Sequence, residues 1–385
     1  MVRFEQHPGG LSPTPILVAL ARRLSRSHRG SACPWRGLPC RARIRLLGLV
    51  TLWAGLALLI PRQATAEGTP DAAVLGKALF FDTSLSADGT VACATCHRPE
   101  SAFSDPRPLS RGVLGRVGTR NAPALIGVSD VRELFWEGRR RSLEELVLDP
   151  LTTPEEHGLD DPRAVLEAVR TRQGLAFTRV FPGEGVTPRT VGLALAAYVR
   201  ALTPAPSPFE RYQRGEAAAL TLAQRRGLAL FTGRAACSRC HVVEGGAFSD
   251  GDYHPGEVLA ELAPRMAAAA RETAGLSLEQ RRRAVPARAE VAALGRYLVT
   301  LRPTDIGRFR TPSLRNVAVT APYMHDGGVS SLAEAVEREL YYRANEGRRV
   351  GDLTPAERAD LVEFLQSLTN PVPPSSERTA PSSLH

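Results

Sequence analysis

The sequence has few of the residues that form disulfides or bind metals through soft donors. It holds six cysteines, three methionines and eight histidines in 385 residues, and aromatic residues make up only 6%. Four cysteines lie in two copies of one short motif, and the other two, Cys33 and Cys40, lie in a segment that we expect to be removed. The remaining chain therefore has no cysteine left for a structural disulfide.

The excess of basic residues is confined to the first 66 positions. The whole chain has a formal charge of +9, but residues 1–66 hold ten arginines and a single glutamate. Residues 67–385 hold 39 basic and 39 acidic residues and are formally neutral. Because nucleic-acid-binding proteins carry clustered basic charge, this balance excludes nucleic acid as the expected partner.

Residues 1–66 have the pattern of a leader with a secretory signal. Arginines at positions 41, 43 and 45 precede the apolar run 46–60, and Ala64-Thr65-Ala66 supplies the small residues of a cleavage site. The apolar run is short for a membrane span. We therefore expect export to the periplasm; the alternative is that the segment remains as a membrane anchor.

The repeated motif is Cys-x-x-Cys-His, which occurs as Cys93-Ala94-Thr95-Cys96-His97 and as Cys237-Ser238-Arg239-Cys240-His241. Two cysteines at this spacing can each bond one vinyl group of a porphyrin, and the next histidine can bind the iron. A single copy would also fit a redox-active cysteine pair. Two copies, 144 residues apart in an exported chain, predict two covalently bound c-type haems.

The pattern of apolar residues predicts an all-α fold with two cytochrome c-like haem domains packed together. Apolar residues recur at three- and four-residue spacing, and no segment alternates convincingly as a strand; the clearest helical segments are 163–172, 190–202, 330–342 and 355–368. In both halves, an amphipathic segment that ends in Leu-Phe precedes the haem motif. We expect an N-terminal haem domain at 67–208, a C-terminal haem domain at 209–370 with a helical insertion at 257–303, and a disordered tail at 371–385.

Few side chains remain to bind the irons on the side opposite the motif histidines. After the leader, the candidates are His157, His254, His325, His385, Met266, Met324 and seven tyrosines. An iron with two strong axial ligands transfers electrons, whereas an open face can bind peroxide or oxygen. This short inventory predicts that one iron is five-coordinate.

Several further segments occur in an order that resembles the bacterial di-haem cytochrome c peroxidases, a family that includes the MauG-type enzymes. The matching segments are Phe80-Phe81-Asp82, Arg120-Asn121-Ala122-Pro123, Phe135-Trp136-Glu137-Gly138-Arg139, Thr311-Pro312-Ser313-Leu314-Arg315-Asn316-Val317 and Ala321-Pro322-Tyr323-Met324-His325-Asp326-Gly327. The resemblance implies a peroxide-binding haem at the first motif and an electron-transfer haem at the second.

The resemblance also implies two catalytic residues. Trp136 matches the tryptophan that couples the haems in the family; its alternative role is that of an ordinary core aromatic. Glu156 matches the carboxylate that takes a proton from bound peroxide and returns it to the departing oxygen. The alternative is that Glu155 and Glu156 form a solvated pair at a helix start. His157 is expected to lie beside the haem rather than to bind the iron.

A calcium ion lies between the haems in the family, bound by one asparagine side chain and two backbone carbonyls. Asn121, Thr320 and Pro322 match those positions, and oxygen donors suit this hard cation. The alternative role for Asn121 is to cap a helix.

The sequence departs from the typical peroxidases at two positions. Val113 stands where they carry a histidine that blocks the first iron, so we expect an open first haem, as in MauG-type members. The ligand of the second iron is methionine or tyrosine in the family, but the ungapped match here is Glu339, which we expect to be a poor ligand. We expect Tyr341 or Tyr342 to be the distal ligand of the second iron, and the alternative role of these tyrosines is to pack the helix. Met324 and His325 are the alternative ligands.

The resemblance as a whole implies a periplasmic oxidoreductase that reduces hydrogen peroxide. Electrons would come from a donor protein, such as a small cytochrome c or a cupredoxin, or from a protein substrate. The alternative is a di-haem electron-transfer cytochrome without peroxidase activity. The sequence leaves the oligomeric state open.

Overall fold

The structure is a computed structural model that describes residues 70–256, 261–345 and 352–371. The predictions of a leader and of a disordered tail concern residues 1–66 and 371–385, which lie outside the described residues except for position 371. No helix among the described residues is both long enough and apolar enough to span a membrane.

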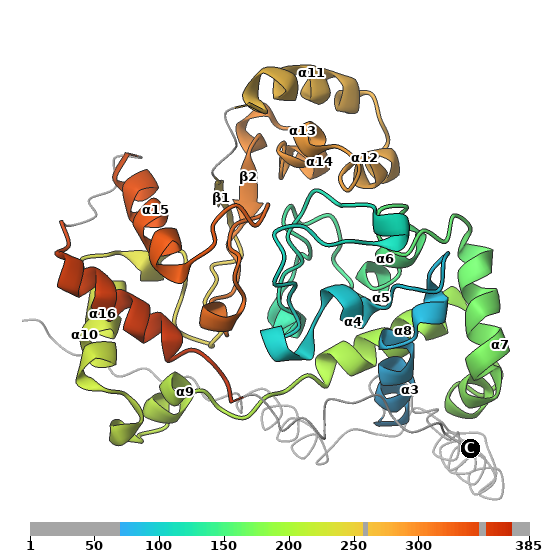
Figure 1. The fold of residues 1–385 in the computed structure, drawn as a ribbon, viewed down its shortest axis with the longest axis horizontal. Coiled ribbons are helices and arrows are strands. Elements are labelled where there is room, and N and C mark those ends of the chain that lie inside the picture. The colour runs from blue at the N-terminus through green and yellow to red at the C-terminus, as the bar shows by residue number, and fades with distance from the viewer. Residues whose placement is uncertain (1–69, 257–260, 346–351, 372–385) are drawn as a thin grey trace, which may run out of the picture. The chain divides into compact units, whose positions relative to one another are not determined.

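The described residues are rich in helix, in agreement with the predicted fold class (Figure 1). Before residue 208 the helices are α3 (Pro70–Phe80), α4 (Cys93–Cys96), α5 (Leu143–Leu146), α6 (Asp149–Thr152), α7 (Pro162–Val180) and α8 (Pro188–Arg200). After it they are α9 (Pro208–Gln213), α10 (Leu222–Thr232), α11 (Ala263–Ala274), α12 (Leu278–Ala284), α13 (Ala289–Ala292), α14 (Tyr297–Thr300), α15 (Leu332–Asn345) and α16 (Pro355–Gln366).

The expected helices correspond to α7, α8, α15 and α16, and hydrogen bonds at their starts explain several boundaries. Thr187 and Thr354 each accept a hydrogen bond from the backbone three residues on, and a proline occupies the next position. A hydroxyl at this place satisfies an N–H that the helix itself cannot pair, and proline tolerates the first helical position. At the start of α7, the Asp161 carboxylate accepts a hydrogen bond from the N–H of Arg163, two residues on, and a proline again follows.

The expectation that the chain has no strands is wrong in one place. Strands β1 (Tyr253–Pro255) and β2 (Arg308–Arg310) form an antiparallel pair, with Tyr253 opposite Arg310. Three residues are too few to show an alternating pattern, so this pair was not visible in the sequence. The pair encloses residues 261–301, which contain α11 to α14.

Three hydrophobic clusters lie within the described residues. The first includes α3, α7 and α8, the second includes α10, α15 and α16, and the third includes α11, α13 and α14. Each of the first two contains a motif cysteine, Cys93 or Cys237, among its partly buried members. The proposed division into two haem domains and an insertion stays a prediction, with these clusters as its physical basis.

The helix that precedes each motif crosses a second helix at a glycine. An added Cβ at Gly76 of α3 would lie 1.9 Å from the carbonyl oxygen of Ala194 in α8, and one at Gly227 of α10 would lie 1.9 Å from that of Asp360 in α16. Figure 1 shows both crossings. The two halves therefore share a close helix contact that only glycine allows.

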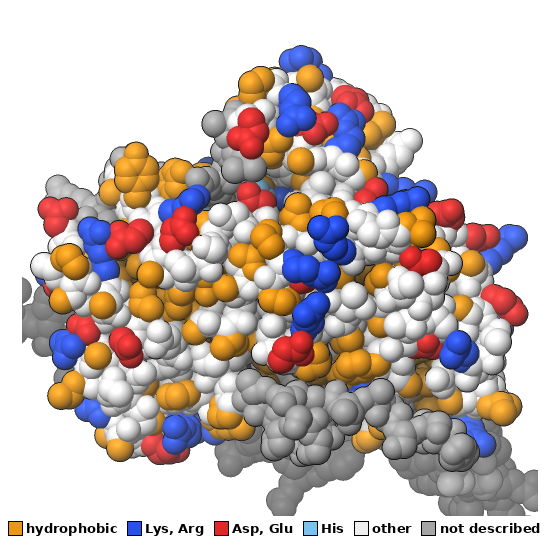
Figure 2. Space-filling model, in the orientation of Figure 1, with side chains coloured by type: hydrophobic (Ala, Val, Ile, Leu, Met, Phe, Trp, Pro, Cys, Tyr) orange, Lys and Arg blue, Asp and Glu red, His pale blue; other side chains and the backbone are white. Residues whose placement is uncertain are grey.

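Acidic and basic side chains are interspersed on the face of the molecule shown in Figure 2. This distribution agrees with the formal neutrality of residues 67–385. That face therefore presents no single-sign field that would select a strongly charged partner.

We predict that Gly76→Ala and Gly227→Ala each lower the free energy of unfolding by about 1–3 kcal/mol, because the helices must separate to admit a methyl group. Chemical denaturation of the haem-loaded protein measures this change. The matched control is Gly174→Ala within α7, where an added Cβ meets no atom within 4 Å. This change should raise stability by about 0.5–1 kcal/mol; equal effects at all three glycines would contradict the account.

Candidate active site

The first motif forms the one-turn helix α4. The hydroxyl of Thr95 accepts a hydrogen bond from the N–H of Ala92 at 3.0 Å, and the N–H of His97 donates to the carbonyl of Cys93 at 2.9 Å. The second motif begins with a 3-10 turn at Cys237–Arg239. All four motif cysteines are half-buried and none of them forms a disulfide, so their sulfurs are not committed to another cysteine.

The two motif histidines are oriented by the same device. Nδ1 of His97 lies 2.9 Å from the carbonyl oxygen of Phe103, and Nδ1 of His241 lies 3.0 Å from that of Phe248. Both phenylalanines have positive φ, 61° and 49°. Burial lowers the pKa of both histidines, so each is a neutral imidazole that donates through Nδ1 and keeps Nε2 for an iron.

The residues that provide these carbonyls were not among the predicted site residues. Both lie in the tetrapeptide Ala-Phe-Ser-Asp, at 102–105 and 247–250. The repetition of this tetrapeptide just after each haem motif is the sequence pattern that could have identified them. It extends the internal repeat from the preceding helix through the motif to the loop that holds the histidine.

The structure brings Glu156 to the first motif. Burial raises the pKa of the thiols of both Cys93 and Cys96, and the negative charge of Glu156 adds to this effect at each. Burial raises the pKa of Glu156 itself to about 7, against an opposing effect from the nearby cation Arg139. A carboxyl group with this pKa can both accept and return a proton near neutral pH, which disfavours the alternative of a solvated pair with Glu155.

His157 lies beside the same motif. Its Nδ1 is 2.7 Å from the carbonyl oxygen of Leu85, and its Nε2 is 4.0 Å from Sγ of Cys93. The side chain is buried, and burial lowers its pKa. The geometry places His157 next to the attachment cysteine Cys93; that it lies beside the haem rather than binding the iron stays a prediction.

The loop that carries Val113 is fixed against the segment of Glu156. The N–H of Val113 donates to the carbonyl of Glu156 at 2.9 Å, and the Val113 side chain is only 1% exposed. An added Cβ at Gly112 would lie 2.1 Å from the carbonyl oxygen of Glu155. The loop is therefore held by backbone contacts. It carries the apolar side chain of Val113 at the position where the typical peroxidases have a blocking histidine.

Trp136 lies where segments from both halves of the chain meet. Its indole N–H donates to the carbonyl of Asn121 at 3.0 Å, and its own carbonyl accepts from the N–H of Arg310 in β2 at 2.8 Å. The side chain is half-buried. The position agrees with a bridge between the two motif regions, although the same contacts would also support a packing role.

A cluster of cations surrounds a single buried carboxylate next to Trp136. Glu137 is fully buried and pairs with Arg139, and Arg120 is 3.8 Å away. Arg310 also lies close enough for the charge of Glu137 to affect its pKa. Burial lowers the pKa of Arg120 to about 10, and among the described residues its Nε and Nη1 have no hydrogen-bond partner.

These residues fit a haem. The neighbouring carboxylate Glu133 already pairs with Arg296 at 2.9 Å, and Glu137 is the only carboxylate within ion-pair distance of Arg120 among the described residues. Buried cations require an anion or a hydrogen-bond acceptor, and each haem carries two carboxylates. The motif cysteines are not in disulfides, the motif histidines are held at Nδ1, and two nitrogens of Arg120 have no hydrogen-bond partner. Together they give the donor set that a c-type haem needs.

The predicted calcium residues come from two segments that lie together. The backbone N–H of Asn121 donates to the carbonyl of His325 at 3.0 Å, and its Nδ2 lies 3.2 Å and 3.3 Å from the carbonyls of Arg107 and Pro108. Because these bonds use Nδ2 of Asn121, its Oδ1 is the side-chain atom that could bind a cation. It lies near the segment that contains Thr320 and Pro322. The alternative role as a helix cap is wrong, because residues 121–125 are neither helical nor adjacent to a helix.

The two tyrosines predicted as ligands of the second iron lie on the exposed side of α15. The exposed fractions of Tyr341 and Tyr342 are 65% and 36%. Glu339, the ungapped match, instead has its charge close enough to affect the pKa values of Cys237 and His241. The structure therefore does not bring the tyrosines to the second motif.

Cys240, Asp250 and His254 form the one group of metal-ligand type found among the described residues, with ligand atoms within 4.8 Å of one another. His254 and Asp250 pair at 2.7 Å. A thioether bond between Cys240 and a haem would use the cysteine sulfur, so this group fits haem attachment rather than a separate metal.

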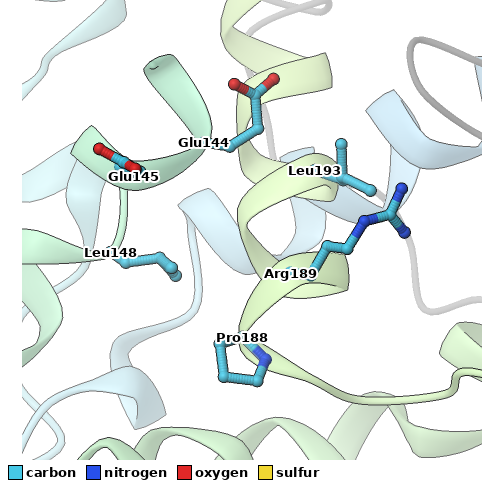
Figure 3. A pocket seen from close by; sticks show the side chains of 6 residues that line it. All are labelled: Glu144, Glu145, Leu148, Pro188, Arg189 and Leu193. Carbon is cyan, nitrogen blue, oxygen red and sulfur yellow. The ribbon is translucent and has the colours of Figure 1, made fainter. Parts of the chain in front are cut away.

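A surface hollow between α5 and α8 lies outside these motifs (Figure 3). Its lining residues are Glu144, Glu145, Leu148, Pro188, Arg189 and Leu193. None of them is a predicted site residue, so the candidate active site remains at the motifs.

Comparison with known proteins identifies the family. A model of the di-haem cytochrome c peroxidases matches residues 70–218. The cytochrome-c peroxidase IdrP2 of Denitromonas iodatirespirans is 32% identical, over 85% of this chain and 92% of the relative. The methylamine utilization protein MauG of Methylorubrum extorquens is 33% identical, over 80% and 81%. A MauG-like protein associated with microbial copper homeostasis has a crystal structure that matches with a TM-score of 0.63 and 30% identity, over 81% and 92%.

The chain belongs to the di-haem cytochrome c peroxidase family, as the resemblance predicted. It is an oxidoreductase of the peroxidase type, with peroxide as the electron acceptor. Membership of this family implies two c-type haems.

We predict that Glu156→Gln slows the reaction of the oxidised holoprotein with hydrogen peroxide by about 10²–10⁴-fold, because the amide cannot accept a proton. In the unchanged protein the rate should rise with pH around 7, as the Glu156 carboxyl loses its proton, and this rise should vanish in the variant. Stopped-flow absorption spectroscopy measures both effects. The adjacent Glu155→Gln should change the rate little; an equal loss there would contradict the role of Glu156.

Proposed function

We propose that the protein is a periplasmic di-haem peroxidase of MauG-like type that takes up hydrogen peroxide at the first motif. Each bound haem would supply an iron that exchanges electrons, and the haem at the first motif would supply the position for peroxide. Cys93, Cys96 and His97 would hold this haem, and Cys237, Cys240 and His241 the other. The observation that carries the proposal is the placement of Glu156, with its raised pKa, beside the first motif.

The proposed role of Glu156 is to move one proton during peroxide cleavage. Its carboxylate would take the proton from one peroxide oxygen and return it to the oxygen that departs. The fixed backbone of Val113 supports this role, because it holds the carbonyl of Glu156 at 2.9 Å and brings no competing ligand. These contacts favour an enzyme over an electron-transfer cytochrome without peroxidase activity, the alternative raised by the sequence.

The proposed role of Trp136 is to couple the two motif regions electronically. Its hydrogen bonds to Asn121 and Arg310 join the segment before α5 to β2. Electrons would enter through the second motif, from a donor protein such as a small cytochrome c or a cupredoxin, or from a protein substrate. The neutral charge of residues 67–385 favours a partner recognised by shape and apolar contact rather than by strong opposite charge.

A calcium ion bound by Asn121, Thr320 and Pro322 is part of the proposal. The support is the hydrogen bond from Asn121 to His325, which brings the two segments together, and the engagement of Nδ2 rather than Oδ1 of Asn121 with backbone carbonyls. Because the carbonyl of Asn121 also accepts the indole N–H of Trp136, a cation here would stiffen the attachment of the bridge.

We predict that Trp136→Phe keeps both haems but slows steady-state peroxide reduction about tenfold or more, which corresponds to a barrier higher by about 1.4 kcal/mol. The smaller ring loses the hydrogen bond to Asn121 and contact area between the two segments. Turnover with a reduced donor and haem content per chain are the two measurements. Tyr297→Phe in α14, which loses a hydrogen bond to the carbonyl of Ala270, is the control for loss of an aromatic hydrogen bond; unchanged turnover in Trp136→Phe would remove the bridge from the account.

We also predict that the purified protein holds a single calcium ion that Asn121→Ala loses, because the variant lacks the only side-chain oxygen of the proposed site. Elemental analysis after dialysis measures bound calcium. Asn316→Ala removes another buried amide, one bonded to Asn370, and should retain the ion. An absence of calcium from the unchanged protein would show the proposed site to be wrong.

A further inference from the structure

One face of α15 is directed toward the second motif. Leu332, Val336 and Leu340 pack against the hydrophobic cluster whose partly buried members include Cys237. Residues three and four positions apart lie on the same side of an α-helix. Glu339 lies three positions after Val336 and Arg343 lies four positions after Glu339, so both share this inward face.

The aromatic residues of α15 lie away from that face. Each residue turns an α-helix by about 100°, which places Tyr341 and Tyr342 more than a quarter turn from Val336 on either side. Their exposed fractions of 65% and 36% agree with this direction. By position on the helix, Glu339 therefore lies on the side of Val336 and the tyrosines lie away from it, although the Glu339 side chain is itself 46% exposed.

Electrostatic effects on the residues of the second motif also indicate that Glu339 lies near this motif. Burial and then the charge of Glu339 raise the pKa of the Cys237 thiol, to about 12. Burial lowers the pKa of His241, whereas the Phe248 carbonyl and the charge of Glu339 act in the opposite direction. Glu339 thus lies close to both the attachment cysteine and the iron-binding histidine.

Arg343 holds the Glu339 carboxylate. Nε of Arg343 lies 3.1 Å from Oε2 of Glu339, one helical turn away, and the Arg343 side chain is only 19% exposed. An ion pair of this kind fixes the direction of a carboxylate. His325, in contrast, stacks on Phe309 with the ring centroids 3.9 Å apart, so it is engaged elsewhere.

We propose that Glu339, held by Arg343, is the side chain on the face of the second haem iron opposite His241, and that a carboxylate oxygen is its sixth ligand. The inference rests on the proposed binding of a haem at Cys237, Cys240 and His241. It differs from the expected tyrosine, and it gives the second iron a hard anionic oxygen donor. Such a donor stabilises the ferric state and lowers the reduction potential relative to a thioether ligand.

The test is spectroscopic and uses the ferric holoprotein without peroxide. Glu339→Gln should shift the absorption and electron paramagnetic resonance spectra of one haem, because it removes the anionic donor. Glu339→Met should give that haem a new low-spin signal and raise its reduction potential, because a thioether is a softer ligand. The spectrum of the other haem serves as the internal reference, and haem content per chain shows whether both haems are attached.

Three matched variants are the controls: Tyr341→Phe, Tyr342→Phe and Met324→Leu should leave both haem spectra unchanged. The proposal is overturned if both Glu339 variants, with two haems attached, give the spectrum of the unchanged protein. It is also overturned if the shift appears in one of the three controls instead. If Glu339→Met attaches only one haem, the nearly isosteric Glu339→Gln decides. Spectral shifts together with an absence of peroxide reduction would support the ligand and reject the proposed peroxidase role.

Discussion

The hydrogen bond between each motif histidine and a phenylalanine carbonyl is the constraint on which both candidate haem sites depend. Phe103 and Phe248 adopt positive φ, which turns their carbonyls toward Nδ1 of His97 and His241. With Nδ1 engaged and the imidazole neutral, only Nε2 is left to bind an iron. The helices before the motifs, which cross their partners at glycines, then hold each motif against its own hydrophobic cluster.

The two motif regions differ in the side chains that lie beside the motif histidine. Beside the first motif lie Glu156, whose pKa is raised by burial, and the buried apolar Val113. Beside the second lies Glu339, paired with Arg343. Two copies of one scaffold thus place a buried carboxyl beside one motif and an ion-paired carboxylate beside the other. Under the proposed function, this difference would suit peroxide chemistry at the first motif and electron storage at the second.

The sequence predicted the helices, both attachment motifs and the family, because helical periodicity and covalent attachment are properties of short segments. A match of neighbouring residues pointed to Glu156, whose catalytic role stays a prediction. The sequence did not predict β1 and β2, whose three residues each leave no periodic pattern. The sequence favoured Tyr341 and Tyr342 over Glu339 by ligand chemistry alone. The direction in which a side chain leaves a helix depends on which face of that helix packs against the core. That face is a property of the folded chain.

The most direct test of the account is electron paramagnetic resonance of the fully ferric holoprotein, before and after one equivalent of hydrogen peroxide. An open first haem predicts a high-spin ferric signal before addition, and coupling through Trp136 predicts that peroxide diminishes the signals of both haems. Two low-spin signals that peroxide leaves unchanged would contradict the account and indicate an electron-transfer cytochrome.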